Sequence, residues 1–111
     1  MTTEVLDLST MAFTPGPNLL SRRLGCAAAV RLDAHRCLVV GGLDGRSSVN
    51  STEVLGITTM TFTAGPVMGS ARYGGAAVPL DSTHILVVGG LDDNDEDLST
   101  TEVRPRLTKL I

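Results

Sequence analysis

The sequence predicts an all-β fold of antiparallel strands, and two observations carry that prediction. The first is an internal repeat: Thr3-Glu4-Val5 returns as Thr52-Glu53-Val54 and again as Thr101-Glu102-Val103, each time 49 residues further along the chain. The second is that the apolar runs are short and bounded by turn-forming residues, with no convincing helical periodicity anywhere. A regular repeat of this kind is typical of folds that use one supersecondary unit several times.

The repeat extends well beyond these three marks. Five positions match at a spacing of 49 residues: Met11, Phe13, Gly16, Pro17 and Arg23 return as Met60, Phe62, Gly65, Pro66 and Arg72. Two segments match at a spacing of 48 residues: Leu32-Asp33 and 38–42 return as Leu80-Asp81 and 86–90. The chain therefore holds two repeat units and a third copy of the opening segment.

Each unit contains four short stretches with strand character. They are the small apolar segment 26–32, the apolar run 37–40, the β-prone segment 52–57 and the alternating segment 60–63. Turn chemistry separates them at 33–35 and at Gly41-Gly42 with the loop that follows, and Ala64-Gly65-Pro66 closes the unit. Four antiparallel strands in about 50 residues form the blade of a β-propeller.

The residue types suit a blade. Alanines in the first strand fit the crowded region near a propeller axis, and the second strand is apolar on both faces because neighbouring blades would cover both sides. The Gly-Gly pairs end the second strands, where close packing or a positive φ leaves no room for a Cβ.

The predicted organisation is one repeat segment over 1–111 that forms an incomplete ring of about two blades. Residues 1–17 supply the third and fourth strands of a partial blade, 24–66 a complete blade, and 72–104 the first three strands of another. Residues 105–111 are an irregular tail, since Pro105 breaks the strand expected there. We expect three sheets of two, four and three strands, with ladders joining 26–32 to 37–41 and 74–80 to 85–89.

These residues resemble the kelch-repeat family. The marks are Gly-Gly after a β-branched run, a downstream glutamate (Glu4, Glu53, Glu102), an aromatic residue in the outer strand (Phe13, Phe62) and an arginine that opens the inner strand (Arg23, Arg72). The chain departs from the family at the position two residues after the glutamate, where Leu6, Leu55 and Arg104 replace the usual tyrosine. The resemblance implies a propeller of five to seven blades, of which this chain supplies only part.

Composition excludes several functional classes. The net charge of −3 argues against a nucleic-acid partner, which usually needs a basic face. No apolar run approaches the roughly 20 residues of a membrane span, and the N-terminus lacks the features of a signal peptide, so the expected compartment is the cytoplasm. We expect no cofactor.

Apparent motifs for chemistry have simpler explanations. Cys26 and Cys37 lie out of register for a disulfide if the turn is at 33–35, and His35 and His84 lack further ligands at metal-binding spacing. The acidic run 92–97 lacks the glycine and the closing glutamate of an EF-hand loop. We expect free thiols, turn histidines and a solvated acidic loop.

The expected function is a non-catalytic protein-protein interaction scaffold. Four long loops, Asn18–Arg23, Leu43–Ser51, Val67–Arg72 and Leu91–Thr100, share one face of the predicted blades, and binding residues are commonly placed on such loops. The candidate partner-binding residues are Arg22, Arg46, Arg72, Tyr73, Asp92, Asp93, Asp95, Glu96 and Asp97. Arg23 and Arg72 have an alternative role as structural residues that pack against neighbouring strands.

Two alternatives stay open. The alternative to a scaffold is a fragment of a larger kelch-fold enzyme of the oxidase, mutarotase or specifier type, whose active site lies in other blades. The chain also holds too few repeats to bury their own faces, which leaves three alternatives. It is a piece of a larger propeller, a homo-oligomer in which three copies complete a six-bladed ring, or a poorly folding product.

The acidic run generates a first prediction. Replacement of Asp92, Asp93, Asp95, Glu96 and Asp97 by serine should change thermal stability little, because exposed like charges contribute little or repel one another. Thermal unfolding followed by circular dichroism measures this. A loss of several kcal/mol would show instead that the run holds an ion or pairs with the scaffold.

Overall fold

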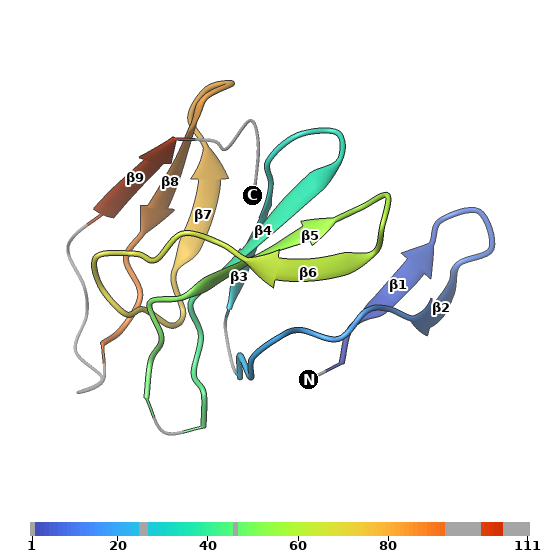
Figure 1. The fold of residues 1–111 in the computed structure, drawn as a ribbon, viewed down its shortest axis with the longest axis horizontal. Coiled ribbons are helices and arrows are strands. Elements are labelled where there is room, and N and C mark those ends of the chain that lie inside the picture. The colour runs from blue at the N-terminus through green and yellow to red at the C-terminus, as the bar shows by residue number, and fades with distance from the viewer. Residues whose placement is uncertain (1, 25–26, 46, 93–100, 106–111) are drawn as a thin grey trace.

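The computed structural model describes residues 2–24, 27–45, 47–92 and 101–105. These residues form nine strands and no helix, in three antiparallel sheets (Figure 1). The strands are β1 (Glu4–Asp7), β2 (Ala12–Pro15), β3 (Ala28–Arg31), β4 (Arg36–Val40), β5 (Thr52–Gly56), β6 (Thr61–Ala64), β7 (Ala76–Pro79), β8 (His84–Val88) and β9 (Thr101–Pro105). The predicted all-β class and the sheets of two, four and three strands are confirmed.

Every strand pairs with its neighbour in the sequence. The sheet orders are β1-β2, β3-β4-β5-β6 and β7-β8-β9. The middle sheet pairs Ala28 with Val40, and the C-terminal sheet pairs Ala76 with Val88, so repeat-equivalent residues occupy equivalent registers. Both predicted ladders are confirmed, although β3 and β7 are shorter than expected and β9 extends through Pro105 at a sheet edge.

The turns also repeat. Asp33 Oδ1 accepts a hydrogen bond from His35 N at 2.8 Å, and Asp81 Oδ1 accepts one from Thr83 N at 2.7 Å. These Asx turns connect β3 to β4 and β7 to β8. They place Cys37 opposite Arg31, one of the two positions that the sequence predicted, whereas Cys26 lies outside the described residues.

The hydrophobic core lies between the middle and C-terminal sheets. It is aliphatic apart from Met68: the buried cluster comprises Val30, Leu32, Leu38, Val40, Val54, Met68, Ile85 and Val87. The inner strands β3 and β7 lie side by side there, and small residues such as Ala28 and Ala77 let them approach. Burial of this apolar surface holds the two sheets together.

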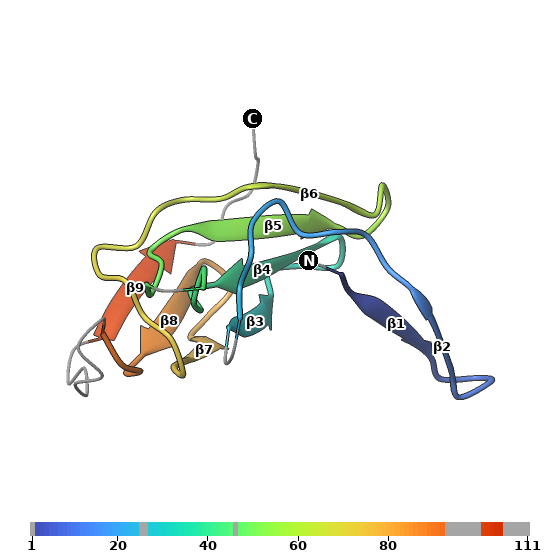
Figure 2. The same ribbon diagram turned by 90° about the horizontal axis from the view of Figure 1, so that it is seen from below.

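The N-terminal sheet stands apart from this core. Figure 2 shows the β1–β2 hairpin projecting at one end of the molecule, with β7–β9 at the other end and β3–β6 between them. Its side chains are mostly exposed, including Phe13 at 63% and Leu8 at 77%. The strand residues of the core cluster lie on β3, β4, β5 and β8, with Ala77 of β7 packed against them, and the β1–β2 hairpin supplies none.

The glycine pairs end strands β4 and β8 with the backbone in the left-handed region, as predicted. Gly41 and Gly42 have φ of 65° and 98°, and Gly89 and Gly90 have φ of 59° and 96°. Gly42 N donates a hydrogen bond of 2.8 Å to the carbonyl of Arg72, which joins the middle sheet to the loop before the C-terminal sheet. A Cβ on Gly41 would overlap that same carbonyl.

The two constraints on Gly41 can be separated experimentally. Gly41→Ala should be less stable than Gly45→Ala by about 2 kcal/mol, because Gly45 has a positive φ of 121° but open space around its Cβ position. Urea unfolding of both variants measures the difference. Equal losses would mean that φ alone, and not the approach of the Arg72 carbonyl, requires glycine at position 41.

Candidate interaction site

Three of the four long loops gather at one end of the sheets, as the strand directions require (Figure 1). Backbone hydrogen bonds join them: Leu24 N donates to Leu43 O at 2.7 Å, and Met68 N donates to Asn50 O at 2.8 Å. The fourth loop is described only as far as Asp92, beside the bridge between Tyr73 and Leu91. These loops form one connected surface, which we call the loop end.

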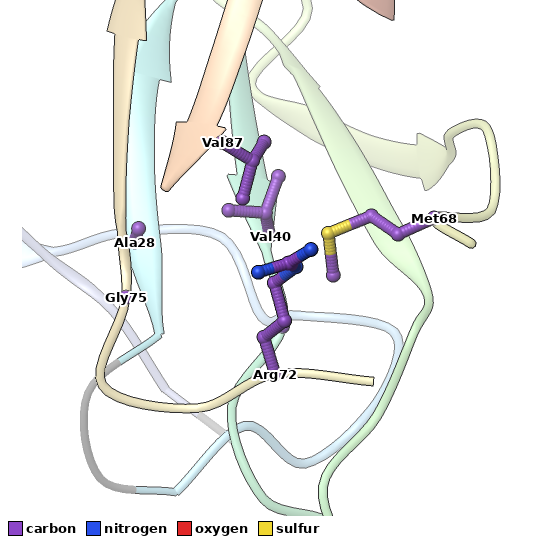
Figure 3. Close-up of a pocket in the computed structure, with 7 residues that line it drawn as sticks. Ala28, Val40, Met68, Arg72, Gly75 and Val87 are labelled. Atoms are coloured by element: carbon purple, nitrogen blue, oxygen red, sulfur yellow. The ribbon is translucent and has the colours of Figure 1, made fainter. Parts of the chain in front are cut away.

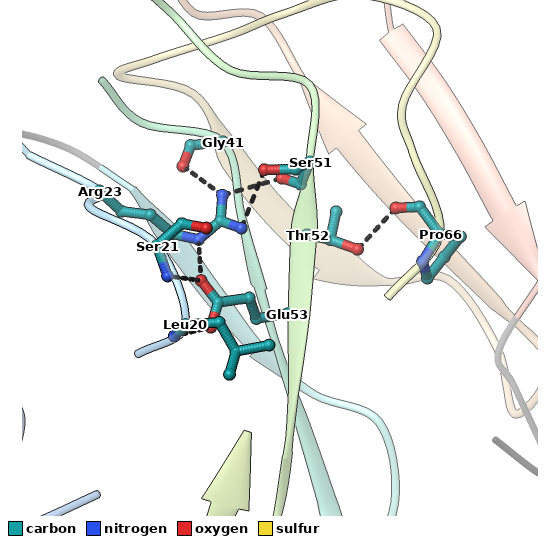
Figure 4. A network of polar contacts seen from close by, with 8 residues as sticks. All are labelled: Leu20, Ser21, Arg23, Gly41, Ser51, Thr52, Glu53 and Pro66. Carbon is teal, nitrogen blue, oxygen red and sulfur yellow. Dashed lines mark hydrogen bonds and ion pairs between the residues drawn. The ribbon is translucent and has the colours of Figure 1, made fainter. Parts of the chain in front are cut away.

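A buried ion pair supports the loop end from beneath (Figure 4). Arg23 Nε lies 2.8 Å from Glu53 Oε2, and the two side chains are 1% and 2% exposed. The guanidinium also donates to the carbonyl oxygens of Gly41 at 3.0 Å and Ser51 at 2.9 Å, and to Ser51 Oγ at 3.0 Å. One arginine thus ties together the ends of β4 and β5.

Glu53 completes the network from the opposite side. Its carboxylate accepts hydrogen bonds from the backbone amides of Leu20, at 2.6 Å, and Ser21, at 3.3 Å. The carboxylate therefore holds the loop that precedes β3 against strand β5. A buried charge of this kind is tolerated because it is both paired and hydrogen-bonded.

Arg72 occupies the same position in the next unit. Its Nη1 donates to Gly89 O at 2.9 Å, as Arg23 Nη1 donates to Gly41 O. Figure 3 shows its guanidinium between Val40 and Met68 in a hollow that Ala28, Gly41, Gly75 and Val87 also line. The cavity volume of about 10 Å³ is near that of one water site and far below the roughly 300 Å³ of a small-molecule pocket.

The predicted partner-binding residues divide into three groups. Arg22 is exposed on the loop end, and Tyr73 and Asp92 are half-buried there, so their binding role stays a prediction. Arg72 is only 2% exposed, because its side chain is packed between the sheets. This placement corresponds to the structural role that the sequence offered as the alternative to partner binding. Arg46, Asp93, Asp95, Glu96 and Asp97 lie outside the described residues.

The pairing of Arg23 with Glu53 was not among the predictions from the sequence, although both residues are repeat marks and a structural role was open for the arginine. The available signal was that both recur at the same spacing of 49 residues, as Arg72 and Glu102. If each repeat unit holds a buried ion pair, its acidic and basic residues are expected to recur at the same spacing.

The exposed turns carry the other charged contacts. Hydrogen bonds from the backbone and the hydroxyl of Thr83, and then from His84, lower the pKa of Asp81 to about 2. His84 Nδ1 lies 3.1 Å from Asp81 Oδ1, so this histidine closes a turn at the start of β8. No group of three His, Cys, Asp or Glu residues placed to hold a metal is found within the described ranges.

No family model matches this sequence, and a search of curated proteins finds no significant match. The described part of the chain also holds no helix with the length and apolar character that a membrane crossing takes.

Loss of the buried carboxylate should be costly. Glu53→Gln keeps the side-chain shape but leaves the Arg23 guanidinium buried without its counter-charge, so we expect a loss of about 3–5 kcal/mol in the free energy of unfolding. Urea denaturation measures it. The control is Asp33→Asn at the Asp33–Arg36 pair, whose carboxylate side chain is 42% exposed; solvent screens this pair, and the expected loss is within about 1 kcal/mol. Equal losses in the two variants would contradict the structural role of Glu53.

Proposed function

We propose that this chain is a non-catalytic, kelch-type protein-binding scaffold whose loop end contacts a protein partner. The repeat of 49 residues, the Gly-Gly pairs and the recurring arginine and glutamate support the kelch assignment. Antiparallel sheets in sequential order, with equivalent residues in equivalent registers, are what β-propeller blades would present. In this proposal the middle sheet is a complete blade.

One observation carries the functional part of the proposal. Loop 43–51 is hydrogen-bonded both to the Arg23 side chain of loop 18–23 and to the backbone of loop 67–72, at one end of the sheets over the buried pair of Arg23 and Glu53. Loops on a rigid scaffold are the usual place for binding residues. The short turns at the opposite end, such as those at Asp33 and Asp81, offer much less surface.

The surface chemistry favours a protein over a small molecule or nucleic acid. The hollow between the sheets is too small for a substrate, and the net charge of −3 suits no polyanion. Arg22 is exposed on the loop end, and arginine is enriched in the core of protein interfaces. We therefore place Arg22 at the centre of the contact, with Tyr73 beside it.

The test compares two exposed arginines at opposite ends of the sheets. Tagged wild-type chain, Arg22→Glu and Arg31→Glu are used to capture proteins, and quantitative mass spectrometry measures each one recovered. A partner of the loop end should be recovered about tenfold less by Arg22→Glu, which corresponds to about 1.4 kcal/mol, and unchanged by Arg31→Glu.

Matched circular dichroism spectra and melting temperatures establish that both variants keep the fold. If no captured protein distinguishes Arg22→Glu from Arg31→Glu, binding at the loop end is contradicted.

A further inference from the structure

Two closely similar hairpin sequences are present, at 3–17 and at 52–66, and only the second hairpin is covered. In the β5–β6 hairpin, Val54 is 1% exposed and Phe62 is 9% exposed. Their equivalents 49 residues earlier, Val5 and Phe13 in β1–β2, are 41% and 63% exposed. The turns of the two hairpins have the same form, with Met11 and Met60 both at positive φ of 57° and 55°. The exposure of Val5 and Phe13 therefore reflects missing neighbours and not a different hairpin.

The missing neighbours can be identified from the covered hairpin. Strand β5 pairs with β4, which sets Leu38 opposite Val54, and Glu53 receives Arg23 from the loop before β3. Among the described strands, β1 pairs only with β2, and Glu4 is exposed. The neighbour that the β1–β2 hairpin lacks is therefore an apolar, antiparallel strand pair beside β1, with an arginine in the loop that precedes it.

The chain contains one other strand pair of this description. Strands β7 and β8 are the repeat equivalents of β3 and β4, with the same register, and Arg72 precedes them with its Nη1 on Gly89 O. Val78 and Val88 of this pair are 42% and 38% exposed. The pair lies at the opposite end of the same molecule from β1–β2 (Figures 1 and 2), so the two do not meet within one copy, whereas a second copy can bring them together.

We propose that the β1–β2 hairpin of one copy pairs with β8 of a second copy, in place of that copy's own β9. The two competing strands share the sequence Thr-Glu-Val, at 3–5 and at 101–103, so the incoming strand offers β8 the same three residues that β9 offers. The incoming hairpin brings β2 as a further strand, whereas β9 ends the described sheet at Pro105. Exchange therefore pairs a free sheet edge and places Phe13 on the same face as the partner's buried Ile85 and Val87.

The repeat predicts the register of this contact. Because Leu38 lies opposite Val54 in the middle sheet and Leu86 lies opposite Val103 in the C-terminal sheet, Val5 should lie opposite the partner's Leu86. Glu4 should then reach the partner's Arg72, as Glu53 reaches Arg23. The contact joins different surfaces of the two copies, so it generates a closed ring or an open chain, and three copies are expected in the closed form. This inference goes beyond the proposed function, because it uses sheet edges and not the loop end.

Disulfide trapping tests the register directly. In a background with Cys26→Ser and Cys37→Ser, one chain carries Val5→Cys and the other Leu86→Cys; the two are co-refolded and oxidised, and the mixed disulfide is measured on a non-reducing gel. The matched control carries Leu6→Cys, which points to the opposite face of β1. We expect the mixed disulfide to be the main product with Val5→Cys and at least tenfold less abundant with Leu6→Cys. Equal yields, or none from either, would overturn the proposed pairing.

Sedimentation equilibrium provides a second measurement that needs no cysteine. The wild-type chain should sediment at about three times its mass of 11.6 kDa at micromolar concentration. Phe13→Asp should raise the dissociation constant at least tenfold, whereas Val67→Asp, at a side chain similarly exposed at 55% but outside the hairpin, should leave it unchanged. A stable wild-type monomer, or equal effects of the two variants, would overturn the inference. The proposed binding by the loop end is measured separately with Arg22→Glu and is unaffected by either result.

Discussion

The arrangement of the middle sheet depends on the interactions of one buried group, the guanidinium of Arg23. It contacts Glu53 on β5, the carbonyl that ends β4 and both polar groups of Ser51, while Glu53 receives the amides of the preceding loop. Removal of either charged partner would leave the other buried and uncompensated. The pair therefore forms only when the loop before β3 and the register of β4 and β5 are both correct. This requirement sets the shape of the loop end.

The arginine position also links one repeat to the next. The side chain of Arg72 bonds Gly89 within its own unit, and its backbone carbonyl accepts a hydrogen bond from Gly42 of the unit before. The glycines are needed because the chain turns at positive φ and because that carbonyl approaches so closely. Arg72 thus contacts the Gly-Gly pair of its own sheet through its side chain and the Gly-Gly pair of the preceding sheet through its backbone. These contacts explain why arginine and Gly-Gly recur at the same spacing.

Closely similar local sequences do not have similar surroundings in this molecule. Val54 is buried because it lies beside β4 in the core cluster, and Phe62 of the same hairpin is also buried, while Val5 and Phe13 of a similar hairpin are exposed. Hydrophobic burial depends on what lies opposite a side chain and not on the hairpin that carries it. The proposed scaffold function and the proposed exchange between copies use different parts of the surface, the loop end in one case and the uncovered hairpin in the other.

The sequence by itself determined the strands, the turns and the sheet membership. These are local properties: short apolar runs, Asx turns at Asp33 and Asp81, and Gly-Gly breaks all act within a few residues, and sequential antiparallel pairing follows from short connections. Tertiary structure alone decided that Arg23 pairs with Glu53, that Arg72 is buried and not displayed, and that only one of two equivalent hairpins is covered. Arg23 and Glu53 are 30 positions apart, and Arg72 and Gly89 are 17 apart; burial and charge pairing across such separations depend on how the sheets pack.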